Sequence, residues 1–187
     1  MASFLLALLL VFALALGGRD QWLVARWADA LGRSAPLLLV GIVSAALTAA
    51  LMAWAGSALA GLLPPRAQWM LVAFALAIAA AELAFPVSIA APREPTRSLG
   101  AIGLVLAARQ VGDAARFAVL ALAAATSLPA AAALGGMLGG GAGIALGWSL
   151  GAQGLARWPL GWVRRGLALC LVLAALFIGL NARYAAL

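Results

Sequence analysis

A carboxylate, an amide and two guanidinium groups stand close together in a stretch of chain that is otherwise almost entirely apolar. The segment AARQVGDAARF, at 107–117, contains Arg109, Gln110, Asp113 and Arg116. Carboxylate and amide oxygens are suitable ligands for hard cations. A charge near the centre of a bilayer costs about 2.5–3.5 kcal/mol on insertion scales. Side chains of this kind therefore indicate either a function or a partner that neutralises them.

A second polar segment, GGRDQ at 17–21, occupies a matching place earlier in the chain. Asp20 precedes Pro36 by 16 residues, and Asp113 precedes Pro129 by the same 16. The two aspartates are therefore candidates for a single site built from two related segments.

The neighbours of Asp113 leave two interpretations open. Arg109 and Arg116 stand at i−4 and i+3, so a continuous helix would place all three on one face as a buried structural ion pair. Alternatively, Asp113, Gln110 and carbonyl groups freed by an interruption of the helix offer oxygen ligands for a divalent cation. Asp20, in the other polar segment, is open to the same two interpretations.

Glu82 is the only charged residue in the apolar stretch 67–91. An intramembrane carboxylate is by default a proton relay or the partner of a buried arginine. Arg19 and Arg109 are the candidate partners, and a position near the membrane boundary, in contact with water, is the remaining alternative.

The composition assigns these side chains to a membrane protein. The chain of 187 residues is 67% hydrophobic and 9% charged, with a mean hydropathy of +1.13. A soluble monomer of this composition would expose large apolar patches. We therefore predict an all-α integral membrane protein with six transmembrane helices, each with the ~20 residues needed to cross a core of about 30 Å. The apolar windows lie at about 4–30, 37–63, 67–91, 98–125, 129–154 and 159–182.

Small residues recur at every fourth position behind each of the two prolines. They are Gly41, Ala45, Ala49, Ala53, Ser57 and Gly61 in the first half, and Gly135, Gly139, Gly143, Gly147 and Gly151 in the second. Such rows let helices pack closely in lipid, which predicts that the second and fifth helices form the packed centre.

These patterns divide the chain into two three-helix repeats, 1–90 and 99–187, joined by a linker at 91–98. Because each repeat has an odd number of spans, the repeats must have inverted topology. Gly17 and Gly18 in the first helix and Gly112 in the fourth predict that these two helices are interrupted. Inverted repeats with interrupted helices are typical of secondary transporters, whose site lies at the midplane.

The positions of the basic residues indicate how the chain is oriented in the membrane. All twelve are arginines, which yield a net charge of +7 but are spread over loops and helix ends, so we expect no nucleic-acid partner. Their excess at the first, third and fifth loops places both termini outside the cytoplasm. The use of arginine alone suggests a GC-rich bacterial genome, and hence the bacterial inner membrane. Asp29 lies at i+3 from Arg26 and i−4 from Arg33, which predicts a surface ion pair.

Enzymatic chemistry has little support. The chain has no histidine, which removes Ser-His proteases and His-ligated zinc sites. Neither Asp20 nor Asp113 has the Gly-x-Gly-Asp context of intramembrane aspartyl proteases, so we expect neither an enzyme nor a cofactor.

At these residues the chain resembles the uncharacterised protein family 0016, cation–proton exchangers for manganese and calcium related to human transmembrane protein 165. That family has two copies of Glu-x-Gly-Asp-Lys/Arg-Ser/Thr, on the first and fourth of six helices in inverted halves. Gly112 and Asp113 match the motif, while Gln110 replaces its glutamate. The final segment, 158–180, is similar to the last helix of the family.

In the first half, the spacing to Pro36 aligns Asp20 with the motif aspartate, and Gly17 and Arg19 then stand at its glutamate and glycine. A shifted register pairs Gly17 with the motif glycine and Gly18 with the aspartate. Both motif glutamates are replaced in either register.

The resemblance implies a transporter that exchanges Mn²⁺ or Ca²⁺ for protons across the lipid bilayer. Asp113 and Asp20 would ligate the ion, with Gln110 as a neutral ligand and Glu82 as a proton carrier. The alternatives are a non-transporting subunit or scaffold whose site is closed by Asp-Arg pairs, and an anion-binding site favoured by the excess of arginine. A homo-oligomer and a partner membrane protein both remain open.

Overall fold

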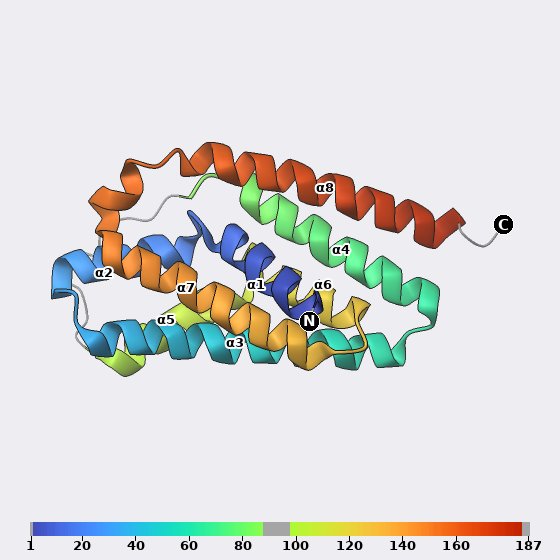
Figure 1. Ribbon diagram of the computed structural model, residues 1–187, viewed down its shortest axis with the longest axis horizontal. Helices are drawn as coiled ribbons and strands as arrows, with labels where there is room; N and C mark the ends of the chain where they lie inside the picture. The colour runs from blue at the N-terminus through green and yellow to red at the C-terminus, as the bar shows by residue number, and fades with distance from the viewer. Residues whose placement is uncertain (1, 88–97, 185–187) are drawn as a thin grey trace.

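The protein is a bundle of α-helices that run roughly along the long axis of the molecule (Figure 1). The structure is a computed structural model that describes residues 2–87 and 98–184, and it contains no β-strand within them. Most of the predicted linker at 91–98 therefore lies outside the described residues. The helices are α1 (Ala2–Ala15), α2 (Arg19–Leu31), α3 (Ala35–Leu62), α4 (Pro65–Ala84), α5 (Leu99–Val111), α6 (Ala114–Ala125), α7 (Pro129–Ala156) and α8 (Leu160–Tyr184).

The prediction of an all-helical fold with long apolar helices is confirmed, and four or five of the six predicted spans are borne out within the described residues. Within the described ranges, α3, α4, α7 and α8 are long and apolar enough to cross a membrane, and the bent pair α1–α2 is a fifth candidate if it counts as one span. Helices α5 and α6 are shorter apolar helices. At 1.5 Å per residue, the 28 residues of α3 and of α7 extend about 42 Å, which exceeds the hydrocarbon thickness.

The first predicted interruption separates α1 from α2, whose axes are bent by 62°. Gly17 has a φ of +72°, in the left-handed region where a residue without Cβ is favoured. A Cβ at Gly17 would lie 3.0 Å from the Cβ of Leu160, so α8 also packs directly on this break. Gly18 follows in an extended conformation as the N-cap of α2.

The second predicted interruption, between α5 and α6, has a different cause. Gly112 has φ −93° and ψ 12°, and nothing lies within 4 Å of the place where its Cβ would be. Asp113 then takes the N-cap position of α6 with extended backbone at φ −90° and ψ 148°. We predicted that glycine loosens both breaks, but only Gly17 adopts a conformation that requires glycine.

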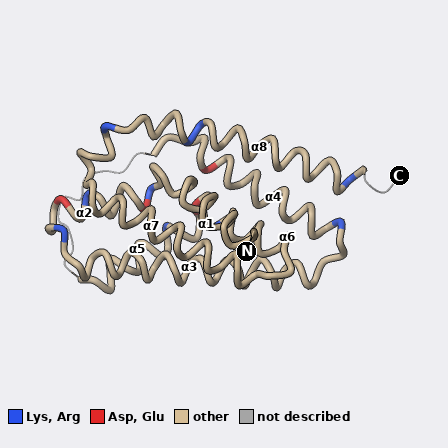
Figure 2. Tube along the Cα trace, in the orientation of Figure 1, with Lys and Arg blue, Asp and Glu red and all other residues tan. Residues whose placement is uncertain are grey.

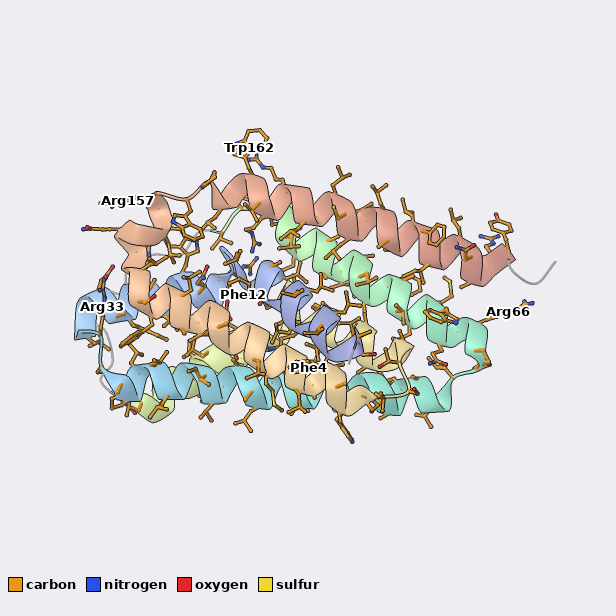
Figure 3. The ribbon with its side chains drawn as sticks, in the orientation of Figure 1. Phe4, Phe12, Arg33, Arg66, Arg157 and Trp162 are labelled. Carbon is orange, nitrogen blue, oxygen red and sulfur yellow. The ribbon has the colours of Figure 1, made fainter. Side chains whose placement is uncertain are left out.

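The glycine row of α7 is a packing face, as its spacing predicts. A Cβ at Gly135 would lie 2.5 Å from the backbone oxygen of Phe4, and one at Gly139 would lie 2.5 Å from that of Leu8. The backbone of α1 therefore rests on that of α7, as in other close helix pairs in lipid. Figure 3 shows Phe4 on α1 beside α7.

Helices α3 and α7 form a packed pair, as predicted for the second and fifth apolar segments, but α3 lies at one edge of the bundle, with Leu39, Leu47 and Trp54 exposed on its outer face (Figure 1). They pack against each other, α7 also contacts α1 and α2, and α3 also contacts α5 and α6. In the small-residue row of α3, Ala45 and Ala49 are fully buried. That row ends before Gly61, which has nothing within 4 Å of its Cβ position.

The predicted ion pair of Asp29 with Arg26 and Arg33 is wrong. Asp29 lies on α2, and its Oδ2 accepts a hydrogen bond of 2.8 Å from the N–H of Ala152. This N–H directly follows Gly151, whose φ of +68° kinks α7. The carboxylate satisfies an N–H donor that the kink frees, because the helical ladder is interrupted there.

Charged residues gather at the ends of the molecule and at a few positions near its middle (Figure 2). Helices α3 and α7 contain none. Arg33 and Arg157 lie at one end of the long axis and Arg66 at the other (Figure 3). An apolar zone therefore separates two basic ends, as expected of a bundle that crosses a bilayer.

Candidate functional site

Buried polar side chains meet where the helix breaks face the middle of α3 and α7. We call them the central polar cluster, and every member has a relative exposure of 6% or less. Its members are Asp20, Gln21, Ser44, Thr48, Gln110, Asp113, Arg116 and Arg164. Three of the predicted site residues, Asp20, Gln110 and Asp113, are therefore brought together although 93 residues separate the two aspartates.

Gln110 joins three helices within this cluster. Its Oε1 accepts hydrogen bonds from the hydroxyl groups of Ser44 (2.9 Å) and Thr48 (3.1 Å) on α3. Its Nε2 donates to Oδ2 of Asp20 at 3.4 Å. Gln110 thus turns its NH₂ group, not its oxygen, toward the carboxylate, so the predicted role as a neutral cation ligand requires rotation of the amide.

Asp113 is buried, and among the described residues its carboxylate has neither a hydrogen-bond partner nor an ion-pair partner. Its relative exposure is 6%. Its backbone N–H donates to the carbonyl oxygen of Gln110 at 3.0 Å, and its own carbonyl accepts from the N–H of Arg116 at 3.0 Å. A buried polar group without a hydrogen bond is costly, so both oxygens are available to a ligand or a proton.

Arg116 is the largest fully buried side chain of the described residues, with 1% exposure. Its Nε donates to the hydroxyl oxygen of Thr48 at 2.8 Å, while Nη2 has no partner. A Cβ on Gly140 would lie 2.9 Å from Nη1. Glycine at this point of α7 therefore makes room for the guanidinium.

The predicted pairing of Asp113 with Arg109 and Arg116 is not formed. Among the described residues, the ion pairs within 4.0 Å join Glu82 to Arg19 and to Arg164. Arg109 lies on the exposed surface of α5. The prediction assumed a continuous helix, but the break at 112–113 removes the i−4 relation to Arg109. Arg116 stays in the first turn of α6 after Asp113, but its Nε donates to Thr48 instead.

Glu82 is held by two arginines. Nη2 of Arg164 lies 3.3 Å from both carboxylate oxygens, and Nε of Arg19 lies 3.5 Å from Oε1. Arg164 also donates through Nη1 to the carbonyl oxygen of Gly17 at 3.3 Å. Arg19 was one of the expected partners, whereas Arg164 was not expected, because its place in the sequence suggested a loop-facing cation.

Gln21 is a second residue that the sequence did not single out. Its Oε1 accepts from the N–H of Gly17 at 2.7 Å, and its Nε2 donates to the carbonyl oxygen of Gly143 at 3.0 Å. Gln21 therefore fixes the first break against α7. The available signal was an amide in the first turn of a helix that follows two glycines.

A cavity of about 520 Å³ lies between α2, α4 and α8 and reaches the edge of the cluster. Its lining includes Gly17, Trp22 and Arg164. Arg164 donates to the carbonyl oxygen of Gly17 and belongs to the central polar cluster, so the cavity reaches the cluster at this side chain.

The described residues contain no group of three or more histidine, cysteine or acidic side chains placed to hold a metal ion. Asp20 and Asp113 are two carboxylates, and any further oxygen ligands must come from hydroxyls, the amide of Gln110 or backbone carbonyls.

Comparison with protein-family models, with curated proteins and with solved structures finds no match. The arguments about function therefore depend on the site itself.

Proposed function

We propose that this protein is a membrane transporter that binds an inorganic cation between Asp20 and Asp113 and exchanges it for protons. The observation that carries the proposal is the carboxylate of Asp113, which is buried with both oxygens unpartnered. A fold gains little from such a group, whereas a transport site needs one that can hold a cation or a proton in turn.

The proposal takes α1–α2 and α5–α6 each as one broken span. This yields six spans in two halves of inverted orientation, with both termini outside the cytoplasm of a bacterial inner membrane. The element order supports it, since each half has two short helices followed by a 28-residue helix and a further long helix. Asp20 and Asp113 lie at the starts of α2 and α6, and discontinuous helices supply ion ligands in many transporters.

The positive ends of the half-helix dipoles at the starts of α2 and α6 stabilise the two carboxylates. The ends of α1 and α5 present backbone carbonyls that no longer have helical partners. In this mechanism Asp20 and Asp113 bind the cation, and Asp113 takes up a proton when the cation leaves. Glu82 carries a proton only if it separates from Arg164, so we assign its pair to the closed state of the site.

Uptake by reconstituted liposomes tests the proposal. Mn²⁺ and Ca²⁺ are the ions that the family resemblance implies, and Na⁺ and K⁺ are added as probes of lower charge. Asp113→Asn should abolish the cation uptake that is driven by protons leaving the liposomes. Asp29→Asn, which changes an aspartate outside the cluster, should transport like the unchanged protein. Full uptake by the Asp113→Asn variant would refute the proposal.

A non-transporting subunit or scaffold is the second candidate, and the ion pairs of Glu82 with Arg19 and Arg164 favour it. These pairs join three helices and close one side of the cluster. A protein of this class should bind no cation at all, and Glu82→Gln should lower its thermal stability. Chloride or phosphate binding that grows stronger in Asp113→Asn would instead indicate an anion site.

A further inference from the structure

Arg116 places a fixed positive charge beside the two aspartates. Its guanidinium is linked to Asp20 through Thr48 and Gln110, yet it forms no ion pair with Asp20 or Asp113 within 4.0 Å among the described residues. One guanidinium nitrogen has no partner, and the side chain is 1% exposed. The positive charge therefore belongs to the cluster without closing the aspartates in an ion pair.

Two contacts hold this charge in place. The hydroxyl oxygen of Thr48 accepts from Nε at 2.8 Å, and Gly140 of α7 lies against the guanidinium. Thr48 also donates to Gln110, which in turn donates to Asp20. The arginine is thus positioned by the same hydrogen-bond network that positions the aspartate.

The buried charges can be counted. With both buried carboxylates ionised, as cation binding requires, Asp20 and Asp113 contribute −2 and Arg116 contributes +1, so these three side chains have a net charge of −1. Arg164 and Glu82 neutralise each other through their ion pair. Arg19 has a side chain that is 49% exposed, so water screens its charge.

We propose that Arg116 is a tethered cation that sets the charge of the substrate, so that the site takes a singly charged inorganic cation in preference to a divalent one. This inference depends on the proposed transport function. Buried charges are stable only when they are compensated. One monovalent cation neutralises the cluster, whereas a divalent cation leaves one uncompensated positive charge beside Arg116.

Three variants change the net charge of the cluster stepwise. Arg116→Gln makes it −2, Asp20→Asn makes it 0, and the double variant Asp20→Asn/Arg116→Gln restores −1. Arg116→Lys keeps the charge and serves as the matched control. Binding of Na⁺, K⁺, Mn²⁺ and Ca²⁺ to each protein in detergent is measured by isothermal titration calorimetry, and folding is monitored by tryptophan fluorescence.

The wild-type protein, the Arg116→Lys variant and the double variant should bind Na⁺ or K⁺ more tightly than Mn²⁺ or Ca²⁺. Arg116→Gln should shift the ratio of affinities toward Mn²⁺ or Ca²⁺ by about tenfold or more. Asp20→Asn should bind no cation. If Arg116→Gln fails to fold, loss of monovalent binding in Asp20→Asn and its return in the double variant make the same test.

An unchanged preference in Arg116→Gln would overturn the inference, as would a double variant that does not regain monovalent binding. If the wild-type protein prefers Mn²⁺ or Ca²⁺ and Asp113→Asn loses this binding, the inference about Arg116 is wrong. The transport proposal would still stand. A protein that binds no cation would refute both.

Discussion

Asp113 contributes little to the stability of the fold, because its carboxylate makes no hydrogen bond and no ion pair within the described part of the chain. Two polar residues near it are better satisfied. Gln110 has partners for both its oxygen and its nitrogen, and Glu82 has two arginines. Within the described part of the cluster, the carboxylate of Asp113 and Nη2 of Arg116 are therefore the groups whose burial the fold does not explain.

Replacement of Asp113 by asparagine should raise stability while it removes cation binding. An unpartnered buried polar group costs about 1–3 kcal/mol, and the neutral amide reduces that cost. Thermal unfolding of the variant, followed in detergent by the fluorescence of the seven tryptophans, should show a higher midpoint. A lower midpoint would mean that the carboxylate is a structural partner of Arg116.

The two helix breaks have different physical origins, and their glycines should respond differently. Gly17→Ala places a side chain at a φ of +72° and against Leu160, so it should destabilise the protein by about 1–2 kcal/mol from the backbone alone. Gly112→Ala, with open space and a negative φ, should stay within about 0.5 kcal/mol. Equal thermal shifts for the two variants would contradict the distinction.

The glycines of α7 should tolerate alanine only where the neighbouring residues leave room for a Cβ. A Cβ at Gly139 would lie 2.5 Å from the backbone oxygen of Leu8, whereas one at Gly141 would lie 3.7 Å from Ile42. Gly139→Ala should therefore cost about 1–3 kcal/mol through overpacking. Gly141→Ala should raise the free energy of unfolding by up to about 1 kcal/mol, because alanine has a higher helix propensity than glycine. Denaturation midpoints check both, and a neutral Gly139→Ala would show that α1 and α7 do not pack this closely.

The whole molecule is a bundle with an apolar middle and two basic ends, and this arrangement predicts its orientation in the membrane. Arg33 and Arg157 lie at one end of the long axis and Arg66 at the other (Figure 3). Arg33 and Arg157 belong to the first and fifth loops, which are rich in arginine in the sequence. We expect the Arg33 end in the cytoplasm.

Cysteine labelling in intact cells measures this orientation. In a background where the exposed Cys170 is replaced by alanine, Arg66→Cys should react with a membrane-impermeant thiol reagent. Arg33→Cys and Arg157→Cys should react only after the cells are opened. The reverse pattern would mean that both termini face the cytoplasm.

Several features of the fold were predictable because they depend on local composition. Apolar length predicts the helices, and the paired polar segments locate both interruptions to within a few residues. The glycine spacing predicts the close face of α7, since small residues at every fourth position share one side of a helix.

Some members of the site were predictable, but its pairings and the members Gln21 and Arg164 were not. Asp20, Gln110 and Asp113 do meet, since matching breaks in two halves converge. The separation of Arg109 from Asp113 and the pairing of Arg164 with Glu82 depend on the bend between α5 and α6 and on how α8 packs beside α4. Tertiary packing of this kind leaves no trace in the spacing of residues along one segment.

Calorimetric titration of Na⁺, K⁺, Mn²⁺ and Ca²⁺ into the purified protein, with Asp113→Asn alongside, tests most directly whether the central polar cluster is a cation site. We predict saturable binding of at least one of these ions, lost in the variant because the unpartnered carboxylate is its principal ligand. Absence of binding even at millimolar ion, or equal binding by both proteins, would contradict the assignment of Asp113 to a transport site.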